Sequence, residues 1–228
     1  MITAQSIYNP LGANYLTKGM ELSPKYIERL EKAGFDGVTV TSLDPKLKLA
    51  PPDDIVQEKT RISAIQNVAT AFHSVEENGT FDPAPLQGIS ENILQDIIAQ
   101  QKNLVQLTDI RLHDSYTFSH SVNVAVLSTM LGDLCGYSKR KLQIITLGGL
   151  LHDIGKLAVP TPILNKSGSL TAGEFKIIRR HPSEGRKILK ELTSPIASIL
   201  AIIAVQHHEH LDGSGYPYHV RGQSIHPY

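Results

Sequence analysis

The sequence predicts a mainly α-helical protein, in which a small α+β module precedes an all-α helical bundle. Two observations carry this expectation. After residue 54, no stretch alternates apolar and polar residues in the way that a half-buried strand does. The same region also carries helix-boundary signals, because Thr171 and Glu174 have the spacing of a capping box and Pro182 suits the first turn of a helix.

The N-terminal module is expected over residues 1–43, with the order β-β-α-β. Two β-prone stretches, ITAQSIY and ANYLTKG, flank a turn at residues 9–12. Ser23 and Pro24 then indicate an N-cap followed by proline at the first helical position, and GVTVTSL indicates a strand rich in β-branched residues. Residues 44–54, DPKLKLAPPDD, contain three prolines and predict a linker.

The helical body is expected over residues 55–228. The segment NGTFDPAPLQG separates the first two of its helices, and further Pro and Gly positions separate the later ones. The expected helices cover 55–77, 90–112, 114–135, 138–154, 171–181, 182–192 and 194–209.

Composition excludes several classes of function. The chain has 228 residues with 22 basic and 22 acidic side chains, so it lacks the positive charge typical of proteins that bind nucleic acid polymers or membrane surfaces. The N-terminus is not a signal peptide, and no apolar segment has the length of a membrane span. A cytoplasmic protein is therefore expected. The one cysteine, Cys135, is expected to be a small buried hydrophobic residue.

Histidines are the informative feature of this chain. His152 and Asp153 end an apolar helix, and Gly155 is expected to stop it. A polar pair at a buried helix end is unfavourable unless both groups are satisfied. A divalent cation would satisfy them, and so would a helix C-cap with a salt bridge, with Lys156 one turn further on. Taken alone, His120 resembles a satisfied core residue and His181 a helix cap.

His207 and His208 are harder to explain as structural residues. His207 shares a helical face with Leu200 and Ile203, which carries it inward, and His208 can converge with it at the helix end. Glu209 is expected to orient an imidazole ligand by contacting its ring, without itself binding the metal. Nitrogen and oxygen donors on several helices are explained together by a metal site in the bundle core, with Asp153 bridging two ions. The lack of cysteine ligands favours a catalytic site over a structural zinc site. Four further histidines are assigned to surface or loops, namely His73, His113, His219 and His226.

Several motifs occur in the order of a known family. HDIGK at 152–156 resembles the signature of the HD superfamily of metal-dependent phosphohydrolases. HHEHLDGSGYP at 207–217 resembles the extended motif of its HD-GYP branch. Three intervening segments are similar to that branch as well: YTFSHS at 116–121, PTPILNKSGSLTAGE at 160–174 and HPSEG at 181–185.

The resemblance implies an HD-type bundle and hydrolysis of the bacterial second messenger cyclic di-GMP to pGpG or GMP through a metal-bridging hydroxide. It implies divalent metal ions, most commonly iron or manganese. It implies two ions and not three, because Tyr116 stands where some members have the glutamate of a third site. Asp153 and Lys156 would be catalytic, with Lys156 also touching a substrate phosphate, and Gly213, Tyr216 and Pro217 would form the substrate side. The implied metal ligands are His120, His152, Asp153, His181, His207 and His208.

The family pattern continues beyond the last residue of this sequence, with a helix that carries a further aspartate. The chain is therefore expected to be C-terminally truncated, and an apolar groove left uncovered there would favour a homodimer or a signalling-protein partner. Two alternative functions stay open beside the phosphodiesterase. One is a catalytically incomplete module that binds cyclic di-GMP or a protein, and the other is a phosphohydrolase acting on another nucleotide.

Overall fold

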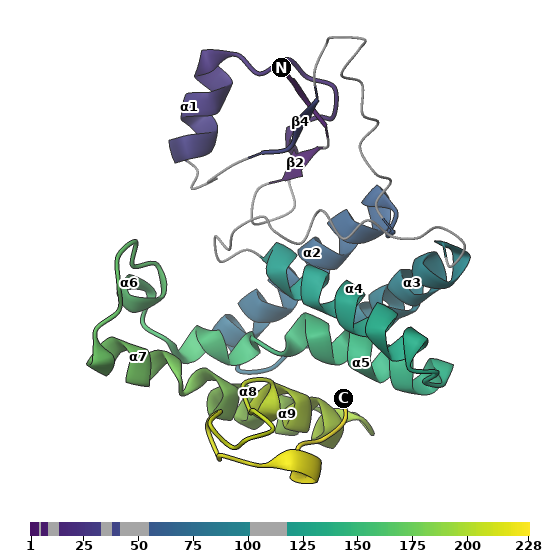
Figure 1. Ribbon diagram of the computed structural model, residues 1–228, viewed down its shortest axis with the longest axis vertical. Helices are drawn as coiled ribbons and strands as arrows, with labels where there is room; N and C mark the ends of the chain where they lie inside the picture. The colour runs from purple at the N-terminus through teal and green to yellow at the C-terminus, as the bar shows by residue number, and fades with distance from the viewer. Residues whose placement is uncertain (5, 9–13, 33–37, 42–54, 101–117) are drawn as a thin grey trace.

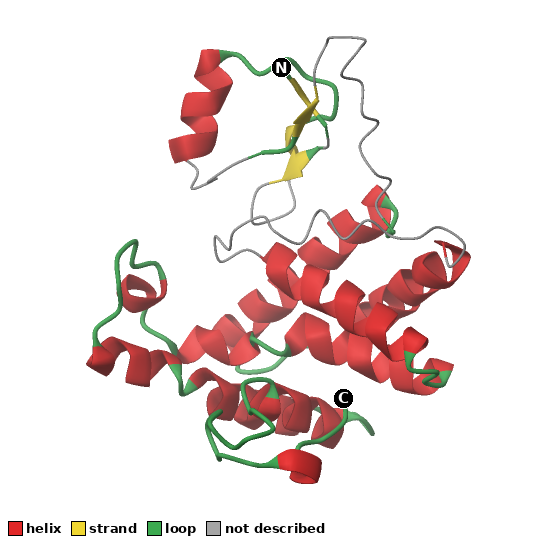
Figure 2. Cartoon of the chain, viewed as in Figure 1, coloured by secondary structure: helices red, strands yellow, loops and turns green. Residues whose placement is uncertain are grey.

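The computed structural model describes residues 1–4, 6–8, 14–32, 38–41, 55–100 and 118–228. Within these ranges the protein is dominated by helices, and strands occur only in the N-terminal part (Figure 2). The predicted mainly α fold is therefore confirmed. Several expectations fall outside the described residues: the turn at 9–12, both ends of the strand at 37–43, the linker at 44–54, the helix residues 101–112, His113 and Tyr116.

The described residues of the N-terminal unit form four short strands and one helix. β1 (Ile2–Thr3) pairs antiparallel with β4 (Val40–Thr41), and β2 (Ile7–Tyr8) pairs antiparallel with β3 (Asn14–Leu16). The single strand expected over ITAQSIY is thus divided into β1 and β2, which belong to different sheets. Helix α1 (Pro24–Lys32) begins at its proline as predicted, with Ser23 accepting from the Tyr26 amide.

The first two helices of the body are α2 (Glu58–Asn78) and α3 (Ala84–Gln100). Helix α2 ends at Gly79, whose left-handed conformation closes the last turn. Helix α3 begins earlier than expected. The segment taken for a separator contains its N-terminus: Asp82 Oδ1 accepts from the Ala84 amide at 2.9 Å, and Pro85 lies in the first turn, where a missing N–H is tolerated.

Two further helices follow, α4 (Phe118–Leu134) and α5 (Lys139–Leu151). Cys135 lies at the end of α4 and is exposed, so the expectation of a buried cysteine is wrong. The reason is local: Leu134 and Gly136 on either side are exposed as well, and Gly136 takes a positive φ of 73° in the turn before α5. Within the described residues, no helix combines the length and the apolar character that crossing a bilayer requires.

The chain then forms shorter elements: the 3-10 helix η3 (Ile154–Ala158), α6 (Thr161–Leu164), α7 (Ala172–Ile178), α8 (His181–Lys190), α9 (Ala197–Gln206) and η4 (Gly222–Ser224). The capping box at the start of α7 is confirmed. Thr171 Oγ1 accepts from the Glu174 amide at 3.2 Å, and Glu174 Oε2 accepts from the Thr171 amide at 2.7 Å. Pro182 lies in the first turn of α8, as predicted.

Helix α5 lies centrally in the bundle, in contact with α3, α4 and α9, while α8 packs on α9 and on η3 (Figure 1). The core between these elements contains fully buried aliphatic side chains, among them Leu150, Leu151, Leu189 and Leu200. Burial of this apolar surface stabilises the bundle. It also fixes the positions at which the four helices α4, α5, α8 and α9 begin or end.

Gly155 has a different role from the helix stop that the sequence suggested. Helix α5 already ends at Leu151, and Gly155 lies inside η3. A Cβ atom at Gly155 would overlap the carbonyl oxygen of His181 and the amide of Gly185 in α8. Glycine is therefore required here because two backbones meet without room for a side chain.

Candidate metal centre

Six predicted ligands meet where four helices begin or end. His120 lies in the first turn of α4, and His152 follows the last residue of α5. His181 begins α8, and His207 follows the last residue of α9. Asp153 and His208 are the next residues along the chain after His152 and His207. Helix packing thus brings together side chains that are up to 88 positions apart, from 120 to 208.

Three of the histidines share one local arrangement at a helix end. The Nδ1 atom of His152 lies 2.7 Å from the Gly149 carbonyl oxygen, that of His181 lies 2.7 Å from Ile178 O, and that of His207 lies 2.8 Å from Ala204 O. Each carbonyl is three residues earlier and lacks a partner in the helix ladder. Because a carbonyl oxygen only accepts, each Nδ1 carries the proton, and a neutral ring then presents a bare Nε2 lone pair.

These Nε2 atoms surround the carboxylate of Asp153. Oδ2 lies 3.0 Å from His152 Nε2 and 3.7 Å from His120 Nε2. Oδ1 lies 3.2 Å from His181 Nε2 and 3.7 Å from His207 Nε2. Each carboxylate oxygen therefore faces a different pair of imidazoles.

The Asp153 carboxylate is buried, and its Oδ1 accepts no hydrogen bond from the residues that the structure describes. Such an atom is unfavourable in a protein interior unless a cation or a donor reaches it. When the rings of His152 and His181 are neutral, with their protons on Nδ1, lone pairs face lone pairs across these short distances. His181 Nε2 and His207 Nε2 are only 3.1 Å apart as well. A metal cation would convert these contacts into coordination bonds, so the donor set fits a metal.

The protonation states agree with that fit. Burial by itself would raise the pKa of Asp153, but the hydrogen bonds that His152 and His181 donate whenever their Nε2 atoms are protonated, together with the charge of Lys156, outweigh burial and hold this pKa well below its usual value. Burial also places the pKa of His207 well below 6.5 and lowers the pKa of His208 to about 4. Near neutral pH the aspartate is therefore anionic and both histidines are neutral, which are the forms that bind metals.

The donors fall into two adjacent groups. One contains His120, His152 and Asp153, and the other contains His181, His207 and His208; within each group the ligand atoms lie within 4.8 Å of one another. Nitrogen and oxygen donors of this kind suit Fe, Mn and Zn. The groups touch through Asp153 and through the rings of His152 and His207, whose centroids are 5.0 Å apart.

The predicted substrate-side residues lie around this centre in different ways. Lys156 Nζ forms a 2.7 Å ion pair with Asp153 Oδ2. The Tyr216 ring stacks on the His208 ring, with centroids 4.6 Å apart and an interplanar angle of 19°. The peptide bond between Tyr216 and Pro217 is cis. Gly213 has a positive φ of 78° and lies against the Arg221 side chain.

The expectation that Glu209 orients an imidazole is wrong. Its carboxylate accepts from the backbone amides of Tyr218 at 2.7 Å and Val220 at 3.0 Å. Glu209 therefore fixes the chain that returns after the loop 211–217. No pattern in the sequence indicated this role, because the partners are backbone amides and not recognisable side chains.

The remaining histidines that the structure describes lie outside the two groups. His73 is an exposed residue of α2 beside two glutamates, and His210 and His219 are exposed loop residues. His226 lies in the C-terminal segment, where its amide donates to Gln206 Oε1. The positions of His73, His219 and His226 agree with the assignment to surface or loops.

Sequence reasoning also missed Arg179. Its guanidinium carbon lies 4.4 Å from the centroid of the Tyr216 ring. Tyr216 belongs to the loop 211–217, and its ring stacks on His208. The only sequence signal was its position, two residues before His181.

A comparison with known protein families covers the part of the chain that forms this centre. A family model described as HD domain matches residues 92–228, which is more than half of the chain. The chain belongs to the HD domain family. The resemblance that the motifs indicated is therefore confirmed.

The motifs of this HD domain supply all six clustered side chains. Four of them come from HDIGK and HHEHLDGSGYP, and the other two come from HPSEG and YTFSHS. All six therefore lie in the part of the chain that the family match covers.

Two curated relatives illustrate the likeness in sequence. Cyclic di-GMP phosphodiesterase PA4108 of Pseudomonas aeruginosa is 29% identical over 215 residues, which cover 92% of this chain and 50% of the relative. The 3'3'-cGAMP-specific phosphodiesterase 1 of Vibrio cholerae is 40% identical over 110 residues, which cover 48% of this chain and 25% of the relative. The chain thus spans at most about half the length of these relatives.

A solved structure illustrates the likeness in fold. It is that of Bd1817, a HDG"Y"P protein from Bdellovibrio bacteriovorus. It aligns with a TM-score of 0.54 and 19% sequence identity, covering 99% of this chain and 81% of that chain. At this identity the likeness concerns the fold, and it agrees with the helical bundle described above.

Proposed function

We propose that this HD domain is a cytoplasmic, metal-dependent phosphodiesterase that hydrolyses cyclic di-GMP to pGpG or GMP. The observation that carries the proposal is the buried Asp153 carboxylate, whose two oxygens face two adjacent groups of histidines. The name of the Pseudomonas relative supports cyclic di-GMP as the substrate.

In this proposal, His120, His152 and Asp153 would hold one divalent ion, and His181, His207 and His208 would hold a second. Iron or manganese suits this mixture of imidazole and carboxylate ligands. When bound, two such ions lower the pKa of a water molecule and stabilise the charge that develops on the phosphoryl group.

The residues of the chain would supply orientation and charge. The Nδ1–H bonds to Gly149, Ile178 and Ala204 hold three imidazoles with Nε2 directed inward, which preorganises the site. Lys156 would contact a substrate phosphate from its position beside Asp153. Tyr216, Pro217 and Gly213 would bound the substrate side.

The test is hydrolysis by the purified chain after chelation and reconstitution with Mn²⁺ or Fe²⁺. Chromatography would follow the conversion of cyclic di-GMP to pGpG and GMP, with the chelated protein as a control. We expect turnover only after metal is added. A folded chain that binds about two ions per molecule but releases no product would overturn the enzyme proposal and leave a binding module.

A second substrate, 3'3'-cGAMP, is favoured by the 40% identity to the Vibrio relative over about half of the chain. The same assay with both cyclic dinucleotides would give the ratio of their kcat/KM values. If the kcat/KM for 3'3'-cGAMP exceeded that for cyclic di-GMP, 3'3'-cGAMP would become the preferred substrate in this proposal. The homodimer and the signalling-protein partner stay predictions, and light scattering of the purified chain would test the homodimer.

A further inference from the structure

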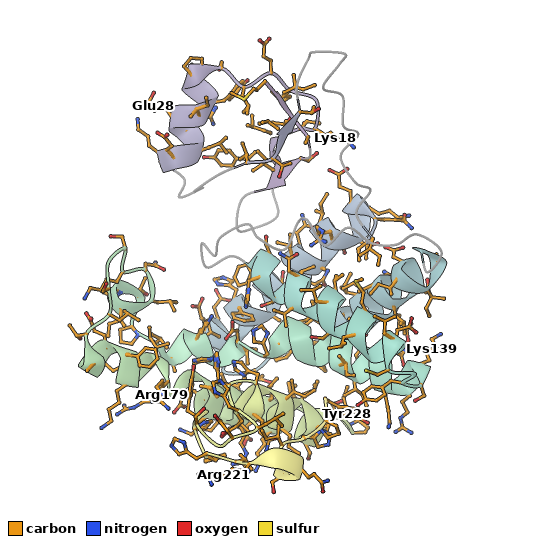
Figure 3. All side chains as sticks on the ribbon, in the orientation of Figure 1. Lys18, Glu28, Lys139, Arg179, Arg221 and Tyr228 are labelled. Atoms are coloured by element: carbon orange, nitrogen blue, oxygen red, sulfur yellow. The ribbon has the colours of Figure 1, made fainter. Side chains whose placement is uncertain are left out.

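Arg179 occupies a defined position at the edge of the metal centre. It follows the last residue of α7 and precedes His181 by two residues, and Figure 3 labels it beside the junction of α7 and α8. Its guanidinium carbon lies 4.4 Å from the Tyr216 ring centroid and 5.8 Å from that of Phe175. Tyr216 in turn stacks on His208, so the guanidinium lies one aromatic ring away from a predicted metal ligand.

The ring contacts hold Arg179 without using its hydrogen-bond donors. Among the residues that the structure describes, the Arg179 guanidinium has no hydrogen bond and no ion pair, although the side chain is half-buried. Arg186 on α8 provides a contrast, because its Nη1 donates to the Tyr218 hydroxyl at 2.9 Å. Arg179 thus offers five N–H donors on a side chain whose orientation is already restricted.

These donors suit a phosphate oxygen. A planar guanidinium forms two parallel hydrogen bonds to a phosphate, and these bonds are stronger than those between neutral groups. Stacking on Tyr216 reduces the conformational entropy that Arg179 would lose on binding. Lys156, the cation beside the two ligand groups, is already paired with Asp153.

A cyclic dinucleotide carries two phosphodiester groups, and only one can lie at the metal ions during hydrolysis. We propose that Arg179 binds the other phosphate and so favours cyclic dinucleotides over phosphodiesters with a single phosphate. This inference rests on the proposed function, since it assigns a second contact to the same substrate.

The test compares the wild-type chain with Arg179→Gln, Arg179→Lys and the matched control Arg180→Gln. Arg180 is the exposed neighbouring arginine and loses the same charge. Two readouts would be taken on the metal-loaded protein: the Kd of cyclic di-GMP by calorimetry, with Ca²⁺ in place of the catalytic metal, and the KM and kcat for cyclic di-GMP and for bis(4-nitrophenyl) phosphate.

We expect Arg179→Gln to raise the Kd and KM for cyclic di-GMP about 10-fold or more, because a charge-assisted contact is lost. The loss for bis(4-nitrophenyl) phosphate should be at least about fivefold smaller, since this ester has no second phosphate. Arg179→Lys should restore less than half of the binding free energy, because an ammonium neither stacks nor forms the fork. Arg180→Gln should match the wild type.

Equal losses for both esters, together with a lower metal content, would show that Arg179 only supports His208 through Tyr216, and would overturn the inference. An unchanged Kd for cyclic di-GMP in Arg179→Gln would overturn it as well. The proposed function fails separately, when the wild-type chain binds cyclic di-GMP without cleaving it, and the binding arm then still decides the role of Arg179. A wild-type chain that neither binds nor cleaves the dinucleotide would overturn both.

Discussion

Replacing Asp153 with asparagine removes one negative charge and leaves the shape of the side chain almost unchanged. The two carboxylate oxygens lie 3.0 Å from His152 Nε2 and 3.2 Å from His181 Nε2, so the substitution reaches both groups of donors. Removing even an outer partner of a metal ligand weakens metal binding by about 10–100-fold. For a carboxylate between two sites, we expect a loss of at least about 100-fold at each.

That loss has a measurable effect on stability. A roughly 100-fold weaker Kd lowers the stabilisation by a saturating metal by about 2.7 kcal/mol per site. For a chain of this size, each kcal/mol shifts Tm by roughly 2–4 °C, so the rise in Tm on adding Mn²⁺ should shrink by roughly 5–10 °C for each site. Thermal unfolding with and without Mn²⁺, combined with elemental analysis of the purified protein, would measure both quantities.

Asp96→Asn is the matched control. Asp96 is also a buried aspartate, but its carboxylate accepts from the backbone and side-chain nitrogens of Gln57 at 3.0 and 2.7 Å, and it belongs to neither group of metal ligands. This variant should lose stability equally with and without metal, so its metal-dependent rise in Tm should equal that of the wild type. If Asp153→Asn kept its bound metal and its full rise in Tm, the assignment of Asp153 to a metal centre would be wrong.

Three further predictions test other parts of the structure. Gly155→Ala should lower the free energy of unfolding measured in urea by about 3 kcal/mol or more, because the new Cβ meets backbone atoms of His181 and Gly185. Gly88→Ala in α3 is the control, and it should be neutral or stabilising because the space around Gly88 is open. Equal effects of the two substitutions would refute the close approach of η3 and α8. In the presence of a chelator, the free energy of unfolding should fall as the pH drops from 6.5 to about 4, because the unfolded chain takes up a proton at His208 in this window while the folded chain does not. The slope of stability against pH should be smaller in His208→Gln. An identical slope would contradict the lowered pKa of His208. Glu209→Gln should speed hydrogen exchange at the amides of Tyr218 and Val220 without changing the metal content of the protein. A loss of metal with unchanged exchange would instead show that Glu209 orients an imidazole.

Features that depend on neighbouring residues could be predicted from the sequence. The capping box at Thr171, the helix start at Pro24 and the mainly α pattern follow from side chains and backbone groups within one helical turn of each other. The cost of burying an unpartnered polar pair at a helix end indicated His152 and Asp153, whereas the full set of six side chains that meet at the centre was implied by the family resemblance of the motifs.

The contacts of those side chains depend on the tertiary structure. The packing of α5, α8 and α9 brings His152, His181 and His207 together and directs the two oxygens of Asp153 to different partners. Glu209 binds distant backbone amides, and Arg179 lies on the ring of Tyr216, as no local pattern indicated. Contacts of this kind depend on how whole helices pack, and a short sequence window contains no information about that packing.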